Sequence, residues 1–152
     1  MMPMLISGRV VTDRLDWAVR MMATIRSLPL DDREAFLADS RNIWTADACL
    51  RRALEAIFDL GRHILVKGFG VASGEYKEVA SALYRCDVLS SGEADTLRVL
   101  AGYRNRLVHF YHEVSAEELY SVSKNDLQDV EQIVAAYQRW LQAHPEKIDK
   151  TL

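Results

Sequence analysis

The stretch NIWTADACLRRALEAIFDLGRHILVKGFG, residues 42–70, decides the fold class of this protein. Its apolar residues recur at steps of three and four from Ile43 to Leu65, the spacing that gathers them on one face of an α-helix. The run ends at Gly68 and Gly70, and closely spaced glycines favour a loop. We therefore predict a long amphipathic helix over residues 43–65, whose apolar face needs partner helices to cover it.

The same periodicity continues on both sides of this segment. It predicts four further helices, within residues 12–27, 75–86, 90–110 and 127–141. Shorter helices are expected after Asp31 and after Ser115, where capping residues precede short apolar segments. No alternating run with a hairpin dipeptide occurs, so we predict no β-strands. The expected fold is an all-α, antiparallel bundle of about four to five main helices with short extra helices.

Length and net charge limit how many domains the chain can form and which kind of partner it can bind. The chain has 152 residues, 49% of them hydrophobic, and 19 Lys+Arg against 22 Asp+Glu give a formal net charge of −3. That is enough for one domain, which we place at residues 10–144, after a flexible leader of residues 1–9 and before a C-terminal tail of residues 145–152. The mild acidity excludes a generic basic coat for nucleic acid and allows only a local basic site.

The compartment and the cofactor class follow from what the sequence lacks. No apolar run is long enough to span a membrane and no signal peptide precedes the helices, so we predict a cytoplasmic protein without membrane contact. Two cysteines cannot form a paired Cys-x-x-Cys site, and His109, His112 and Glu113 make only a weak cluster of metal ligands. No phosphate-binding glycine loop is present. We therefore predict neither a metal nor a cofactor in this chain.

The segment YRNRLVHFYH, residues 103–112, is the candidate site. It combines arginines, histidines and tyrosines without an acid, whereas residues 113–131 hold six acids and one lysine. Arginine binds phosphate through two parallel hydrogen bonds, and imidazole exchanges protons near neutral pH. A basic, aromatic segment of this kind fits phosphodiester chemistry that needs no metal.

Helical geometry constrains how Arg104 and His109 cooperate. Five residues at 100° each place the two side chains about 140° apart around one straight helix. A composite site therefore needs either a helix that ends near His109 or a second copy of the motif across a dimer. We favour a homodimer in which two-fold symmetry brings both motifs to one cleft.

Residues 104–111 resemble the HEPN superfamily, and within it the HepT-type toxins with their Arg-x4-His-x-Tyr motif. The similarity extends over about residues 10–141, including the segments around Phe36, Leu54 and Gly61 and the closing helix after Ser115. It implies an all-α, homodimeric, metal-independent ribonuclease that is the toxin of a toxin-antitoxin pair and whose partner is a nucleotidyltransferase antitoxin.

The resemblance also assigns roles to residues. Arg104 would hold the scissile phosphate of an RNA, and His109 would act as general acid and base while the ribose 2′-OH attacks. Tyr111 would receive AMP, which the antitoxin takes from ATP, and the adenylate would repel RNA. Asn105 is the polar position of the motif that could orient a partner group, and Arg106 is a charge that positions phosphate or is simply solvated.

Two other interpretations stay open. The protein can instead be a non-catalytic helical subunit that binds a nucleotide or the nucleotidyltransferase, in which case the motif only docks phosphate. Arg104 and His109 would then be a structural pair at a helix end. His63, beside Ile64 on the long helix, we interpret as a core histidine rather than a ligand.

Overall fold

The predicted long helix forms the centre of the structure. In the computed structural model, which describes residues 5–151, helix α3 spans Ser40–Phe69. Asp39 caps its start by accepting a hydrogen bond from the backbone N–H of Arg41. Gly70 ends it in the left-handed conformation, φ 66°, which glycine adopts without steric cost. The helix is longer than its apolar run because both ends carry capping residues.

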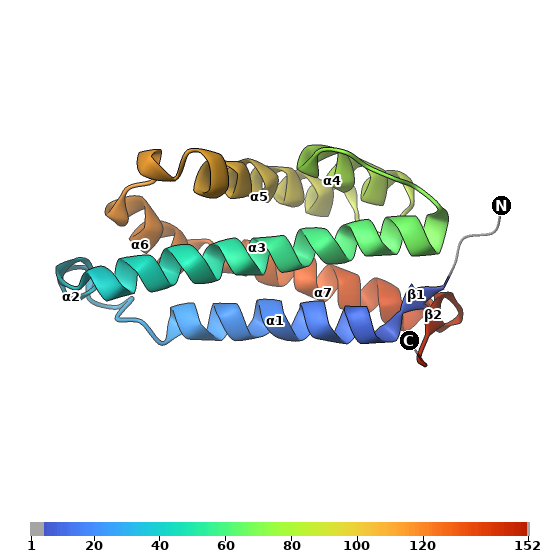
Figure 1. Cartoon of the computed structure of the whole chain (residues 1–152), viewed down its shortest axis with the longest axis horizontal. Coiled ribbons are helices and arrows are strands. Elements are labelled where there is room, and N and C mark those ends of the chain that lie inside the picture. The colour runs from blue at the N-terminus through green and yellow to red at the C-terminus, as the bar shows by residue number, and fades with distance from the viewer. Residues whose placement is uncertain (1–4, 152) are drawn as a thin grey trace.

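The other helices pack around α3. They are α1 (Gly8–Arg26), α2 (Arg33–Ala38), α4 (Tyr76–Arg85), α5 (Ser91–His109), η1 (Tyr111–Glu113), α6 (Ala116–Asn125), α7 (Leu127–Ala143) and η2 (Pro145–Lys147), the two η elements being short 3-10 helices. Figure 1 shows α3 between α1 on one side and α4 and α5 on the other, with α7 behind it. This arrangement confirms the expected all-α bundle with short extra helices.

The contact between α3 and α7 depends on one glycine. Tyr137 of α7 is completely buried and donates its hydroxyl to the carbonyl oxygen of Ile57, at 3.0 Å. A Cβ atom on Gly61 would lie 2.6 Å from that hydroxyl oxygen. Gly61 therefore lets the two helices approach closely enough for the buried hydroxyl to find an acceptor.

Two short strands correct the prediction that the chain has none. β1 (Ile6–Ser7) pairs in parallel with β2 (Ile148–Asp149), and Ile6 is completely buried. Part of the expected leader and tail is therefore ordered structure, since residues 6–9 lie in β1 and α1 and residues 145–149 lie in η2 and β2. Residues 1–4 of the expected leader lie outside the described residues. Strands of two residues are too short to show a periodicity of two in the sequence.

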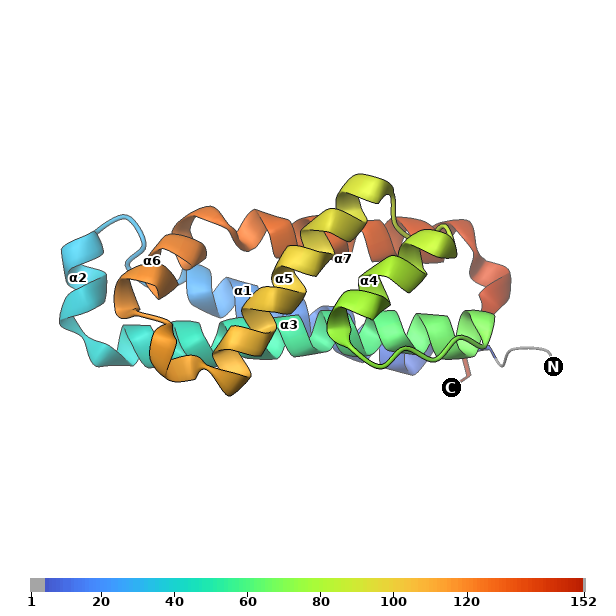
Figure 2. The same ribbon diagram turned by 90° about the horizontal axis from the view of Figure 1, so that it is seen from above.

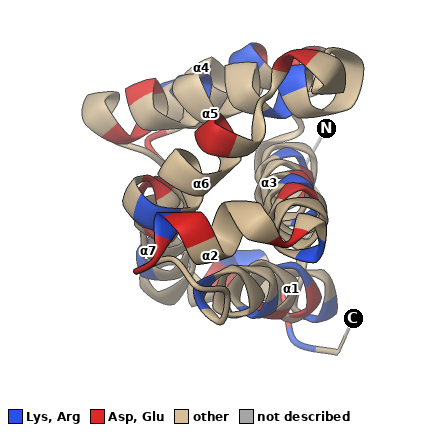
Figure 3. Ribbon diagram, turned by 90° about the vertical axis from the view of Figure 1, so that its left-hand side faces the viewer, with Lys and Arg blue, Asp and Glu red and all other residues tan. Residues whose placement is uncertain are grey.

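Helix α5 carries the candidate motif and crosses the bundle obliquely. Ser90 and Glu93 form the expected capping box at its start. Figure 2 shows α5 running over α3, so that its C-terminal end lies beyond the edge of the long helix. Basic and acidic residues are interspersed over the end of the bundle shown in Figure 3. The motif therefore lies at a protruding helix end and not in the interior.

Candidate active site

The motif occupies the last two turns of α5 and the turn that follows. The helix ends at His109, and the backbone N–H of Phe110 still donates to the carbonyl of Arg106, at 2.9 Å. Phe110 then leaves helical geometry, at φ −128°. Of the two arrangements that the spacing allowed, the structure shows the helix end at His109. The dimer stays a prediction, because the structure contains one copy of the chain.

His109 and Tyr111 are both accessible to solvent. His109 is exposed at the last position of α5, and Tyr111 is 67% exposed at the first position of η1. The ring of Tyr111 meets that of His112 edge to face, with 5.8 Å between the ring centroids. A polymeric substrate or a modifying enzyme can therefore reach both the imidazole and the phenol.

Arg104 lies on the opposite, inner side of the helix and is anchored there. Its Nε donates a hydrogen bond to Oε1 of Glu55, at 2.9 Å, and Nη2 lies 2.8 Å from the same oxygen in an ion pair. Its guanidinium also lies over the ring of Tyr76, 4.2 Å from the centroid. The arginine side chain is only 13% exposed. This cation is held in one place by groups from α3 and α4.

Asn105 and Arg106 have different interaction partners. The side-chain oxygen of Asn105 accepts a long hydrogen bond from Nη1 of Arg104, at 3.4 Å. Arg106 forms a bidentate ion pair with Glu118 of α6, in which Nη1 donates to Oε2 at 2.7 Å and Nη2 donates to Oε1 at 2.9 Å. Hydrogen bonds from Arg106 hold the pKa of the Glu118 carboxyl below its usual range. The position of Asn105 suits an orienting role, whereas Arg106 already has an anionic partner within the fold.

Glu55 and Tyr76 are the site residues that the sequence did not indicate. Glu55 lies 49 positions before Arg104, and no local pattern links the two. Tyr76 follows the glycine-containing segment after α3 and looks in the sequence like an ordinary helix-start residue. Only the crossing of α3, α4 and α5 brings these groups to the motif.

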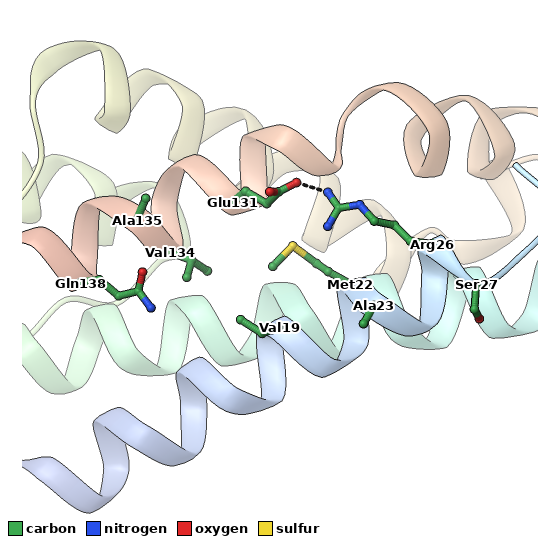
Figure 4. Close-up of a pocket in the computed structure, with 9 residues that line it drawn as sticks. All are labelled: Val19, Met22, Ala23, Arg26, Ser27, Glu131, Val134, Ala135 and Gln138. Carbon is green, nitrogen blue, oxygen red and sulfur yellow. Dashed lines mark hydrogen bonds and ion pairs between the residues drawn. The ribbon is translucent and has the colours of Figure 1, made fainter. Parts of the chain in front are cut away.

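An apolar pocket lies away from the motif. It is a cavity of about 650 Å³ between α1 and α7, open at one side and lined mainly by apolar side chains. Figure 4 shows that Arg26 and Glu131 meet across it in an ion pair, while Met22 and Val134 point into it. A smaller cleft of about 240 Å³ between α1 and α3 includes Glu55 in its wall. The candidate site adjoins this smaller cleft through Glu55, the ion-pair partner of Arg104.

The side chains that could bind a metal and the helices that could span a membrane were both considered in the predictions above. No group of three or more His, Cys, Asp or Glu side chains within residues 5–151 is arranged to hold a metal ion. In the same part of the chain, no helix has the length and apolar character needed to cross a membrane.

An Arg-x4-His pair at the protruding end of a helix, in an antiparallel all-α bundle, defines a protein of the HEPN superfamily. More particularly, the chain belongs to the HepT-like family, described as "Ribonuclease HepT-like", whose model matches residues 19–137. None of the curated proteins compared with the chain matches it.

Solved structures share the fold. A tri-AMPylated HEPN toxin from Shewanella oneidensis, in complex with the MNT antitoxin, has a TM-score of 0.76 and 21% identity, covering 86% of this chain and 97% of that one. The cytosolic protein of unknown function YutE from Bacillus subtilis has a TM-score of 0.77 and 20% identity, and the match covers 93% of this chain and 95% of that one. A chain of a toxin-antitoxin complex with AMP-PNP has a TM-score of 0.74 and 20% identity, and the match covers 84% of this chain and 97% of that one. At such identities these likenesses establish the fold alone.

Proposed function

We propose that this protein is the toxin of a toxin-antitoxin pair and that it is a metal-independent endoribonuclease. The observation that carries the proposal is the presence of both a fixed cation, Arg104, and an accessible imidazole, His109, within the last two turns of one helix in a HepT-like ribonuclease fold. A fixed cation stabilises charge that develops on a phosphate, and an accessible imidazole exchanges protons with the reacting oxygens.

The proposed step is an internal transfer of the phosphoryl group. Neutral His109 accepts the proton of the ribose 2′-OH, and O2′ forms a bond to phosphorus while the bond from phosphorus to O5′ breaks. The departing O5′ takes up a proton from a second acid, for which the His109 of the other subunit is available in a homodimer. The products are a 2′,3′-cyclic phosphate and a 5′-hydroxyl. Arg104 stabilises the charge on the non-bridging oxygens, so the protein side chains supply the chemistry.

The exposed side of α5 supports the homodimer. Val99 is 68% exposed, and a Cβ atom on Gly102 would meet nothing within 4 Å, so both positions are open to a partner chain. Gly102 lies seven residues before His109, which places both on the same side of the helix within about 20°. Two chains that meet along this stripe under two-fold symmetry bring their two His109 side chains together.

The exposure of Tyr111 supports its proposed modification. A nucleotidyltransferase antitoxin would bind ATP, so that the Tyr111 hydroxyl oxygen bonds to the α-phosphorus, pyrophosphate leaves and the phenolic proton is lost. ATP is then a substrate of the partner and no cofactor of this chain. The added phosphodiester carries a negative charge two residues from His109 and repels the RNA backbone. The Shewanella toxin shows that a HEPN toxin can carry AMP groups in complex with its antitoxin.

Cleavage of RNA by the purified protein in EDTA tests the proposal. We expect products with 2′,3′-cyclic phosphate ends, and we expect Arg104→Ala and His109→Ala each to lower kcat/KM by at least about 100-fold. The matched control is His112→Ala, which removes a neighbouring exposed imidazole. Intact RNA, or cleavage that both motif variants preserve, would contradict the proposal. RNA or nucleotide binding without cleavage would instead support the non-catalytic subunit.

A further inference from the structure

The ring of Tyr76 is shared by two arginines. Arg104 lies 4.2 Å and Arg62 lies 4.4 Å from its centroid, and Phe58 of α3 contacts it at an edge, with 4.9 Å between the ring centroids. Guanidinium groups are attracted to the electron-rich face of an aromatic ring, most strongly where water is partly excluded. Arg104 is 13% exposed, so its contact with Tyr76 lies in such a place.

Tyr76 is itself held in position from the segment before α4. Nη2 of Arg62 donates to the carbonyl oxygen of Gly74, at 2.6 Å, and the backbone N–H of Gly74 donates to Glu78, at 3.2 Å. These bonds fix the chain on both sides of Tyr76, at the first position of α4. The ring therefore forms a fixed platform for the guanidinium of Arg104.

Glu55 and Tyr76 together determine which edge of that guanidinium is open. Glu55 takes the side edge, which consists of Nε and one hydrogen of Nη2, and Tyr76 covers a face. On the remaining edge, formed by Nη1 and Nη2, the bond found within residues 5–151 is the long one from Nη1 to Asn105, at 3.4 Å. An edge with two outward N–H groups matches two oxygens of a phosphate.

We propose that Tyr76 and Glu55 are positioning residues that present the Nη1/Nη2 edge of Arg104 to the phosphate. The inference rests on the proposed ribonuclease function and extends it to two residues outside the motif. Both act through Arg104, by removing its freedom to rotate before the transition state forms. Fixed charges of this kind need no reorganisation during the reaction.

Kinetics on matched variants test the roles. Tyr76→Phe retains the ring, so we expect nearly unchanged kcat, whereas Tyr76→Leu and Glu55→Gln should lower kcat by about tenfold, which corresponds to about 1.4 kcal/mol, with little change in KM. Tyr84→Leu, on the exposed side of α4, is the control and should retain kcat. In an Arg104→Ala background, Tyr76→Leu should have no further effect on kcat. The proposal would be overturned if Tyr76→Leu lowered kcat by the same factor in the Arg104→Ala background as in the wild type. It would also be overturned if Tyr76→Phe and Tyr76→Leu lowered kcat equally.

A measurement without catalysis separates this inference from the proposed function. In protein labelled with ¹⁵N-arginine, the Arg104 signals are assigned by their loss in Arg104→Lys. We expect a ring-current shift on the Arg104 guanidinium that persists in Tyr76→Phe and disappears in Tyr76→Leu. Addition of a dinucleotide with a 2′-deoxy group should then shift the Nη signals and leave the Nε signal in place. A shift of the Nε signal, or no change in any Arg104 signal, overturns the positioning role even where RNA cleavage is confirmed. The expected shifts support that role even where no cleavage occurs.

Discussion

Ser7 donates its backbone N–H to Nε2 of His63, at 2.9 Å, and so joins the start of α1 to the last third of α3. The same serine caps α1 through its side chain, which accepts from the backbone N–H of Val10. His63 must be neutral at Nε2 to accept this bond. The expected structural role of His63 agrees with this contact, which belongs to the fold and not to the motif, but the side chain is half-buried and not in the core.

The free energy of unfolding should therefore fall as the pH drops from about 7.5 to 6. Burial, followed by the charges of Lys67 and Arg14, lowers the pKa of His63 below its ordinary value near 6.5. The unfolded chain then binds more protons than the folded chain below that value, so the stabilisation is complete above pH 6.5 and is lost as the pH falls towards the depressed pKa.

Thermal unfolding at pH 7.5, 6.5 and 6.0 measures this loss. His63→Gln, which keeps an acceptor and does not titrate in this range, should remove most of the pH dependence. His112→Gln, at an exposed position, should leave it as in the wild type. A His63→Gln profile identical to the wild-type profile would show that another group causes the dependence.

Gly61→Ala should destabilise the protein by about 1–3 kcal/mol, because the new methyl group overlaps the hydroxyl of Tyr137 and α3 and α7 must separate. Gly92→Ala, near the start of α5, is the matched control, since a Cβ atom there meets nothing within 4 Å and this variant should not be destabilised. Urea denaturation of both variants gives the two free energies. An unchanged Gly61→Ala midpoint would mean that the hydroxyl can move at no cost.

Val99→Glu should weaken the proposed homodimer by at least about tenfold without destabilising the subunit, because Val99 is 68% exposed in a single chain and the charge would be buried in the dimer. Val66→Glu, at an exposed valine of α3, is the control and should leave the dimer intact. Sedimentation equilibrium measures the dissociation constant. A wild-type monomer at working concentrations, or a dimer that Val99→Glu leaves intact, would refute the proposed interface.

Tyr111→Phe should retain ribonuclease activity and stability but escape silencing by the antitoxin. The side chain is 67% exposed, so removal of its hydroxyl costs little folding free energy, and AMP has no oxygen to which it can attach. Mass spectrometry of Tyr111 after co-expression with a neighbouring nucleotidyltransferase measures the modification, and Tyr84→Phe is the control with another exposed tyrosine. An unmodified wild-type Tyr111 peptide would remove the proposed switch.

Local signals in the sequence predicted much of the fold. The apolar spacing from Ile43 to Leu65 predicted α3, and the Ser90 and Glu93 pair predicted the start of α5, because helix periodicity and capping involve residues a few positions apart. The pairing of β1 with β2 was missed for the opposite reason. It joins residues near the two ends of the chain through strands of two residues each, which leave no periodic pattern.

The helical class and the chemical groups of the motif could be predicted from the sequence, because both depend on residues that are close together in the chain. The inward direction of Arg104, towards Glu55 and Tyr76, and the solvent-exposed position of His109 follow from how the helices pack. These contacts join residues 49 and 28 positions apart, since 104 − 55 is 49 and 104 − 76 is 28. This difference arises because a guanidinium is fixed where a carboxylate binds one of its edges, and the oblique crossing of α5 over α3 brings the Glu55 carboxylate to Arg104.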